Sequence, residues 1–186
     1  MAIQVLDVGG KNGKNARSYF PDAEITVVDK ADGWDVMEKG LPNGEWDVVF
    51  LSHIIEHVTN PDYLLDECKR VVGKSGTIII ATPNLGAWFN RILLLLGYQP
   101  HFTEVSTLYD VGKFRLGKEE KPGGHLRICT ARALKQLLLK HDFRIKEFKG
   151  KPIGYKLPPI LKQVDAFFGL FPSTAAELRV KCGYWD

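Results

Sequence analysis

VLDVGGKNG, residues 5 to 13, is the stretch that decides the fold, and ITVVDK, residues 25 to 30, completes it. The aliphatic and β-branched residues from Val5 to Val8 predict a buried strand, and the glycines after them allow a tight turn. A helix and a second strand follow, and the second strand ends on Asp29. This order is that of a nucleoside-binding βαβ unit, in which a carboxylate about twenty residues beyond the first glycine can take both ribose hydroxyls.

The glycine spacing does not fit the two common phosphate-binding loops. A dinucleotide site requires G-x-G-x-x-G, but Lys11 stands where the second glycine is needed. A P-loop requires G-x-x-x-x-G-K-[ST], whereas the interval from Gly9 to Gly13 is one residue too short and Asn15 replaces the hydroxyl. Both phosphate interpretations are therefore weakened, although an adenosine-shaped site is still predicted.

A second informative stretch is EWDVVFLSHIIEHVTNPDYLLDECKRVVGKSGTIIIATPN, residues 45 to 84. Residues 48–51 and 77–81 are continuous apolar runs, which is typical of strands buried on both faces. Between them, apolar residues recur at helical spacing. We therefore expect a strand, a helix and a strand, with the helical apolar face formed by Leu64, Leu65, Cys68, Val71 and Val72.

These stretches resemble class I S-adenosylmethionine (SAM) dependent methyltransferases. The chain matches their E/D-x-G-x-G-x-G loop at Asp7, Gly9 and Gly13 and departs from it at Lys11. Residues 45–84 resemble the methyltransferase 11 family with its "FD-x-V … EH-V … RVL-x-x-G-G-x-L … PN" progression. The resemblance covers the first half of the chain strongly and the second half loosely. It implies an α/β, Rossmann-like, mostly parallel open sheet with a final antiparallel strand, and SAM as the cofactor.

The connection after the second strand is short. Between Asp29 and Asp47 lie only 17 residues, among them three glycines and a proline. A crossover between parallel strands alone needs a dozen or more residues. We therefore expect the usual second helix and third strand to be shortened or lost, with Asp35 and Val36 as the remnant of the turn that contacts adenine.

The second half of the chain predicts a cover over the substrate. Because the chain starts at the first strand, we expect something other than N-terminal helices to cap the site. Residues 85–98 are helix-length and apolar nearly all round, so they either pack on the sheet or form part of that cover. Residues 98–124 lack periodicity and end in Gly123-Gly124, which predicts a lid. Further along we expect a short strand at 125–130, a helix at 131–143 capped by Thr130, a strand at 144–150, an amphipathic helix at 160–171 and the antiparallel strand at 177–185.

Composition and length limit the class of protein. With 186 residues and 45% hydrophobic content, residues 1–186 are expected to form a single domain, with 85–124 and 153–172 as the acceptor-side cover. The longest apolar run, residues 92–96, is far below the roughly 20 residues of a membrane span, and no signal segment precedes the first strand. A cytoplasmic protein is expected, for which membrane contact could only be peripheral.

Charge and cysteine content exclude two further classes. The formal net charge of +3 is scattered along the chain, so a nucleic-acid partner is not expected. Three widely spaced cysteines predict buried thiols rather than disulfides or a zinc cluster.

Several candidate site residues carry two interpretations. Asp29 either binds the ribose or only caps the next turn. Asp7 must be hydrogen-bonded if it is buried, and it either anchors the loop or reaches the cofactor ammonium, as in similar enzymes. Lys11 either swings into solvent or intrudes on the site. Together with the resemblance, the pattern predicts as cofactor-binding residues Asp7, Gly9, Gly10, Gly13, Asp29, Lys30, Asp35, Val36, Ser52 and His53.

Histidines supply the catalytic candidates. HIIEH, residues 53–57, formally matches the H-x-x-E-H motif of a zinc hydrolase, but it follows a buried strand and the same letters are habitual in methyltransferase 11 relatives. No metal is therefore expected. Glu56 and His57 either cap the helix start or face the substrate. His125, between the lid glycines and the next segment, can act as a base or simply bond a backbone carbonyl.

The predicted function is methyl transfer from SAM to a small or lipid-like acceptor, at oxygen or carbon. The alternative is a SAM- or nucleoside-binding protein without catalysis, such as a sensor or an inactive partner, because Lys11 departs from the glycine pattern. The sequence alone specifies neither the acceptor nor an oligomeric state.

Overall fold

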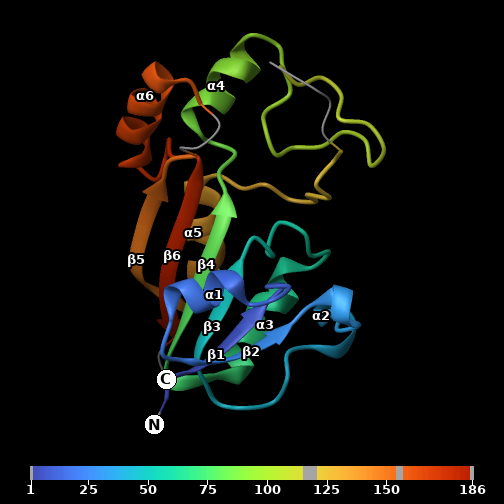
Figure 1. Cartoon of the computed structure of the whole chain (residues 1–186), viewed down its shortest axis with the longest axis vertical. Helices are drawn as coiled ribbons and strands as arrows, with labels where there is room; N and C mark the ends of the chain where they lie inside the picture. Colours follow the sequence, from blue (N-terminus) through green and yellow to red (C-terminus); the bar gives the residue numbers. More distant parts are fainter. Residues whose placement is uncertain (1, 115–120, 154–156, 185–186) are drawn as a thin grey trace.

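The computed structural model describes residues 2–114, 121–153 and 157–184. Its centre is a six-stranded sheet with the order β2-β1-β3-β4-β6-β5 (Figure 1). Strands β1, β2, β3 and β4 pair in parallel, while β6 runs antiparallel to both β4 and β5. The predicted Rossmann-like sheet with a final antiparallel strand is confirmed. The strands are β1 (Gln4–Val8), β2 (Glu24–Val28), β3 (Trp46–Ser52), β4 (Val72–Pro83), β5 (Phe143–Lys151) and β6 (Glu177–Tyr184).

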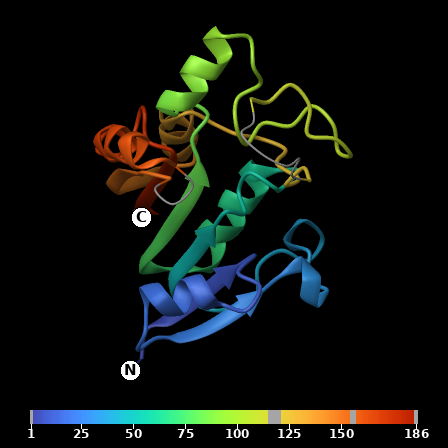
Figure 2. The ribbon, with the colours of Figure 1, turned by 45° about the horizontal axis from the view of Figure 1, so that its top comes forward.

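Helices lie on both faces of this sheet and beyond one end of it (Figures 1 and 2). Proline at the first turn and the Asn60 side chain, which accepts from Tyr63 N, begin α3. Thr130 caps α5 as predicted, because its hydroxyl accepts from Ala133 N. The helical segments are α1 (Lys14–Tyr19), η1 (Lys30–Asp32), α2 (Val36–Lys39), α3 (Pro61–Val71), α4 (Trp88–Leu95), α5 (Ala131–Lys140) and α6 (Pro159–Gly169).

Alternating side chains of β1 and β3 divide the core into two layers. Leu6 and Leu51 belong to the larger cluster, which also contains the apolar faces of α3 and α5. Val5 and Phe50 point to the opposite face and meet Ala16 of α1 in a much smaller cluster. Because α1 covers only part of this second face, a cleft of about 980 Å³ lies beside it, with side chains of β3, β4 and β6 in its lining.

The third strand of the usual sheet is lost, as the short connection predicted. Between β2 and β3, in residues 29–45, the structure forms only η1 and the four-residue α2. Asp35 caps α2 by accepting from Met37 N at 2.9 Å. The shortened connection leaves β2 at the edge of the sheet.

One expectation about the second half of the chain is corrected, and one open alternative is decided. Residues 125–130 form no strand, only the isolated bridge between Asn84 and Cys129, because the amides of Leu126 and Arg127 donate to the Glu56 carbonyl instead. Helix α4 continues past the carboxyl end of β4, next to α6, rather than packing on a sheet face (Figures 1 and 2). Residues 115–120 of the expected lid, residues 154–156 of the cover and Trp185 of the last strand lie outside the described residues.

Candidate active site

The strand order reverses between β1 and β3, and this defines the site. From β1 the chain moves outward to β2, whereas from β3 it moves outward to β4. In open α/β sheets a crevice forms at the carboxyl ends of the two strands at such a switch point, and ligands bind there. Gly9 follows β1, and Ser52 and His53 end and follow β3. The predicted cofactor residues from two distant stretches therefore meet at one crevice.

The glycine loop is folded tightly against Asp7. Gly9 and Gly13 have φ angles of 73° and 70°, in the left-handed region that favours glycine. A Cβ on Gly10 would lie 2.0 Å from Oδ2 of Asp7, so a side chain at this position would displace the carboxylate. The loop can therefore adopt this course only with glycine at these positions.

Asp7 is a buried acid without a partner. Its side chain is fully buried, and neither carboxylate oxygen has a hydrogen bond among the described residues. Burial raises its pKa to about 6, which the nearby Arg17 partly opposes and Asp29 reinforces. A buried Asp7 was expected to have a hydrogen-bond partner, and the described residues supply none. Because an unpaired buried carboxylate is costly, the position suits a cationic ligand group such as the ammonium of SAM.

Asp29 takes the capping role, one of the two that the sequence left open. It is buried, and Oδ1 accepts from Ala31 N at 2.8 Å while Oδ2 accepts from Lys11 N at 2.9 Å. It therefore caps the turn after β2 and holds the glycine loop. Each carboxylate oxygen has a second lone pair, which leaves acceptor capacity for a ribose hydroxyl.

Lys11 stays out of the crevice. Its φ of 51° shows that the backbone keeps the left-handed conformation that glycine would adopt here. Its side chain is exposed, as the swing-out alternative expected, and its backbone amide is the part that contributes to the site.

A pocket of about 270 Å³ lies between the glycine loop and the shortened connection. Lys30 and Asp35 form an ion pair of 2.6 Å at its mouth, which raises the pKa of Lys30 and lowers that of Asp35. Five predicted site residues line this pocket, namely Gly9, Lys30, Asp35, Val36 and His57. The other lining residues are Val8, Val28, Trp34, Met37, Ile54, Val58 and Thr59.

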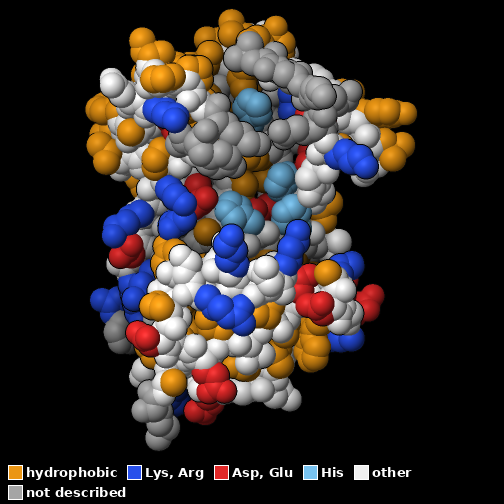
Figure 3. Space-filling model, in the orientation of Figure 1, with side chains coloured by type: hydrophobic (Ala, Val, Ile, Leu, Met, Phe, Trp, Pro, Cys, Tyr) orange, Lys and Arg blue, Asp and Glu red, His pale blue; other side chains and the backbone are white. Residues whose placement is uncertain are grey.

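The larger cleft begins at the carboxyl end of β3. Ser52 and His53 line it from the sheet, while Phe102, His125 and Ile153 line it from the cover. Figure 3 shows histidine side chains gathered in the hollow between the sheet and the cover. Two of the segments expected to cover the acceptor therefore reach this cleft.

His53 is held as a cation between two carboxylates. Its Nε2 lies 3.3 Å from Glu177 and its Nδ1 lies 3.2 Å from Glu56. These bonds raise the pKa of His53 to about 9, Glu177 contributing most. Burial would raise the pKa of Glu177, but His53 and Arg179 lower it to about 2. At neutral pH His53 is therefore a hydrogen-bond donor, and it has no free lone pair to act as a base.

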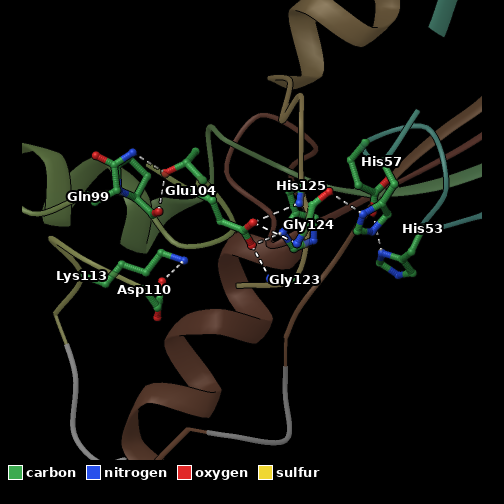
Figure 4. A network of polar contacts seen from close by, with 12 residues as sticks. His53, His57, Gln99, Glu104, Asp110, Lys113, Gly123, Gly124 and His125 are labelled. Atoms are coloured by element: carbon green, nitrogen blue, oxygen red, sulfur yellow. Dashed lines mark hydrogen bonds and ion pairs between the residues drawn. The ribbon is translucent and has the colours of Figure 1, made fainter. Parts of the chain in front are cut away.

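The structure brings the two predicted catalytic histidines together. The rings of His57 and His125 stack with centroids 4.7 Å apart. Nδ1 of His57 donates to Gly124 O at 3.0 Å, and Nδ1 of His125 donates to Glu104 at 3.1 Å (Figure 4). A backbone carbonyl can only accept, so Nδ1 of His57 carries a proton, and in the neutral ring Nε2 carries the lone pair.

Two functional neighbours were missed from the sequence. Glu104 lies in the aperiodic loop, and its carboxylate accepts the backbone amides of Gly123, Gly124 and His125. Glu177 begins β6 and bonds His53. Both are single acids with no local pattern, so only the fold reveals their partners.

The sheet, with its crevice at the switch point, has the fold of class I SAM-dependent methyltransferases. A model of the methyltransferase-domain family matches residues 2–147, so the chain belongs to this family. The SAM cofactor expected from the sequence is that of the family.

Relatives and solved structures agree with this family. The chain is 26% identical over 118 residues to the ubiquinone biosynthesis O-methyltransferase of Glaesserella parasuis, covering 63% of this chain and 42% of that protein. A SAM-dependent methyltransferase from Archaeoglobus fulgidus has a similar fold, with TM-score 0.55, 17% identity and coverage of 97% of this chain and 86% of that chain. A methyltransferase from Haloferax volcanii, solved with the Trm112 methyltransferase activator, gives TM-score 0.62, 10% identity and coverage of 100% and 84%.

The match to curated relatives is partial. The chain spans 42% and 23% of the length of the first relatives that it matches. Among the described residues, no helix has the length and apolar character needed to cross a membrane.

Proposed function

We propose that the protein transfers a methyl group from SAM to a small or lipid-like acceptor, at oxygen or carbon. The observation that carries this proposal is the unpaired, buried Asp7 beneath the glycine loop, at the switch point of the sheet. A cationic amino-acid group placed there satisfies a carboxylate that the chain leaves without a partner. SAM carries such a group beside a sulfonium whose methyl is electrophilic.

The chain's own residues mainly bind and orient. Asp7 supplies the negative charge opposite the ammonium of SAM, and Asp29 supplies the acceptor for the ribose hydroxyls. The pocket of about 270 Å³ supplies the space for the adenine. Methyl transfer is an in-line displacement, so holding donor and acceptor in line accounts for much of the rate. His53, which is charged at neutral pH, donates hydrogen bonds at the mouth of the cleft.

His125 is the better candidate for a base. It lines the large cleft, and the Glu104 carboxylate, which already accepts three backbone amides, holds Nδ1 as a donor. Nε2 is then free to accept a proton from an acceptor hydroxyl. His57 stacks on this ring and keeps it in place.

The cover favours an apolar acceptor. Phe102 and Ile153 line the cleft, and Trp88 of α4 stacks on Phe168 of α6 in the cover. Apolar side chains of these two helices are also exposed, which allows peripheral contact with a lipid surface. The name of the Glaesserella parasuis relative, an O-methyltransferase of ubiquinone biosynthesis, supports a lipid-like acceptor and transfer to oxygen. The exposed apolar residues are Ile92, Leu94, Leu95, Leu96, Ile160, Phe167, Leu170 and Phe171.

A binding protein without catalysis is the second candidate, because Lys11 stands where the family loop has glycine. Calorimetry with SAM and S-adenosylhomocysteine, followed by a methyl-release assay over apolar phenols, sugars and nucleic acid, separates the two. Saturable binding without methyl release would favour the sensor. The cytoplasmic location expected from the sequence remains a prediction.

Asp29→Ala tests the cofactor site directly. Hydrogen bonds to a charged group contribute about 1.5 to 3 kcal/mol, so the variant should weaken SAM binding about ten- to a hundred-fold. Asp22→Ala, at an exposed position between α1 and β2, is the matched control. Unchanged binding by a folded Asp29→Ala protein would contradict the ribose assignment.

A further inference from the structure

We propose that Glu56, His57 and His125 form a binding site for a divalent transition-metal ion such as Zn²⁺. Each of the three residues offers one ligand atom, and these atoms all lie within 4.8 Å of one another. Neighbouring ligands of a tetrahedral Zn²⁺ with bonds of about 2.0 to 2.1 Å lie roughly 3.4 Å apart. An ion would therefore have to draw the three ligand atoms together by up to about 1.4 Å and turn the stacked imidazole rings so that a nitrogen of each points at it.

One ring nitrogen of each histidine has the kind of hydrogen-bond partner, here called an outer partner, that metal-binding histidines usually have. Histidines that bind a metal through one ring nitrogen usually donate the other N–H to a carboxylate or a backbone carbonyl. His57 Nδ1 donates to Gly124 O, and His125 Nδ1 donates to Glu104. Nε2 of each ring has no hydrogen bond among the described residues, so both lone pairs are available.

Glu56 is a fully buried carboxylate with spare capacity. Oε2 accepts from the Thr82 hydroxyl at 2.9 Å, and Oε1 lies 3.2 Å from His53 Nδ1. Each oxygen has two lone pairs, so one on each remains for an ion. Thr82 and His53 thereby fix the orientation of the carboxylate.

Backbone bonds assemble the cluster before any ion arrives. The Glu56 carbonyl accepts the amides of Leu126 and Arg127 at 2.8 and 3.1 Å, which brings the segment carrying His125 against the segment after β3. Glu104 holds the same segment from the other side through the amides of residues 123–125. The side chains of the site thus stand on a backbone that is fixed at both ends (Figure 4).

The donor set selects the kind of ion. Two imidazoles and one carboxylate suit Zn²⁺ and its first-row neighbours, whereas Mg²⁺ and Ca²⁺ prefer oxygen ligands throughout. Three protein ligands leave at least one open position, as in catalytic zinc sites. His125 lines the large cleft, which provides a path for the ion and for a further ligand.

This site differs from the one suggested by the H-x-x-E-H spacing. That motif would use His53 and His57 with Glu56 as the base. In the structure His53 bridges Glu56 to Glu177, and His125 from the far end of the lid takes its place beside His57. The ligand set is therefore a product of the tertiary structure.

The ion would sit between the pocket of about 270 Å³, which His57 lines, and the large cleft, which His125 lines. With the ion bound, Nε2 of His125 is a ligand and no longer a base, and the open coordination position can hold an oxygen of the acceptor instead. This role rests on the proposed function, whereas the ability to bind the ion does not.

The test is titration of the chelator-treated full chain with Zn²⁺ by calorimetry at pH 7.5. We expect saturable binding of a single ion per chain. Loss of an outer partner weakens metal binding roughly 10- to 100-fold, and Glu104→Gln should weaken Zn²⁺ binding by about that amount. His57→Ala and His125→Ala each remove a ligand and should weaken Zn²⁺ binding by more. Circular dichroism checks that each variant is folded.

His141→Ala is the matched control, because His141 lies between Asp62 and Asp66 and is the strongest competing ligand away from the cleft. It should leave the Zn²⁺ affinity unchanged. The proposal is overturned if the wild-type chain does not bind Zn²⁺, or if His141→Ala abolishes binding while His57→Ala and His125→Ala do not.

A measurement on the wild type alone keeps the test valid if a variant fails to fold. In ¹⁵N spectra of the histidine rings, Zn²⁺ should shift Nε2 of His57 and His125 and leave their Nδ1 protonated. Shifts confined to His53, His101 or His141 would contradict the site. S-adenosylhomocysteine binding is titrated separately in chelator, so a chain that binds Zn²⁺ but not this ligand refutes the proposed function and not the metal site.

Discussion

Asp7 is the residue at which stability and binding oppose each other. Its carboxylate is buried without a partner, so the ionised form destabilises the free fold. With a folded pKa of about 6 against an ordinary value of 3.8, the stability of the free fold is highest below pH 3.8, where the carboxyl is protonated, and part of it is lost as pH rises through 6. The loss amounts to about 3 kcal/mol, from about 1.4 kcal/mol for each pKa unit.

The first prediction is a pH-dependent affinity. A bound ammonium favours ionised Asp7, so S-adenosylhomocysteine should bind about ten-fold more weakly at pH 5 than at pH 7, measured by calorimetry. The other charged groups that act on Asp7 are Arg17 and Asp29. In Asp7→Asn the affinity should be lower and nearly independent of pH over this range. A wild-type affinity that stays flat would contradict the ammonium assignment.

Lys11→Gly is the second prediction. Lysine at a φ of 51° carries a cost of about 1 kcal/mol that glycine does not, and its exposed side chain lies outside the crevice. The variant should therefore bind SAM as well as the wild type or better, and Lys14→Gly on the exposed start of α1 serves as the comparison. A collapse of affinity on titration would instead make the Lys11 side chain a ligand contact.

At the scale of elements, the lid is fastened through Glu104. The third prediction is that Glu104→Gln speeds hydrogen exchange of the described lid amides, residues 98–114 and 121–125, because a neutral amide accepts the three backbone bonds less strongly. Glu45→Gln, at an exposed position before β3, should leave these rates unchanged. In the wild type, S-adenosylhomocysteine should slow exchange in the same amides. If these amides are already fully protected in the free protein and do not respond to ligand, the segment is a fixed part of the fold and not a lid.

His141 clamps the end of α5 to α3. Burial would lower its pKa, but bonds to Asp62 and Asp66 at 2.9 and 3.0 Å raise the pKa above its ordinary value. The stabilisation is therefore fully present below the unfolded pKa of 6.5 and is lost as pH rises through the higher folded value.

The fourth prediction follows from this sign. His141→Gln should lower the free energy of unfolding by about 1 kcal/mol or less at pH 6, since both aspartates are largely exposed, and by less at pH 9. Urea unfolding at the two pH values measures the difference. A larger effect at pH 9 than at pH 6 would show that the clamp is not ionic.

At the scale of the whole molecule, the ligand joins the two halves of the switch point. The fifth prediction is that S-adenosylhomocysteine at a hundred times its dissociation constant stabilises the chain by about 2.7 kcal/mol. For a chain of this size that corresponds to a rise in melting temperature of about 5 to 10 °C. NAD⁺ and ATP should produce no comparable rise in the same thermal-shift experiment, because the glycine spacing fits neither phosphate loop. An equal rise with NAD⁺ would favour a dinucleotide site.

Much of the fold and of the cofactor half of the site could be predicted. The alternation in β1 and β3, the helical spacing in α3 and the glycines of the loop each report which face of a short segment is buried or where the backbone must turn. These are local properties, so pattern predicted the single strands, the glycine turn and the lost third strand, while the arrangement of the sheet came from the family resemblance. Residues 125–130 were the exception, because their amides bond the Glu56 carbonyl instead of a strand.

The sequence by itself therefore determined the class of fold, the nucleoside side of the crevice and the family. Only the tertiary structure decided that Asp7 is unpaired, that His53 is bound by Glu177, and that His57 meets His125 above Glu56. The physical reason is distance along the chain. Periodicity reports how a segment buries its own side chains, whereas the path of a long irregular loop, held by a few backbone bonds, decides which distant polar groups meet.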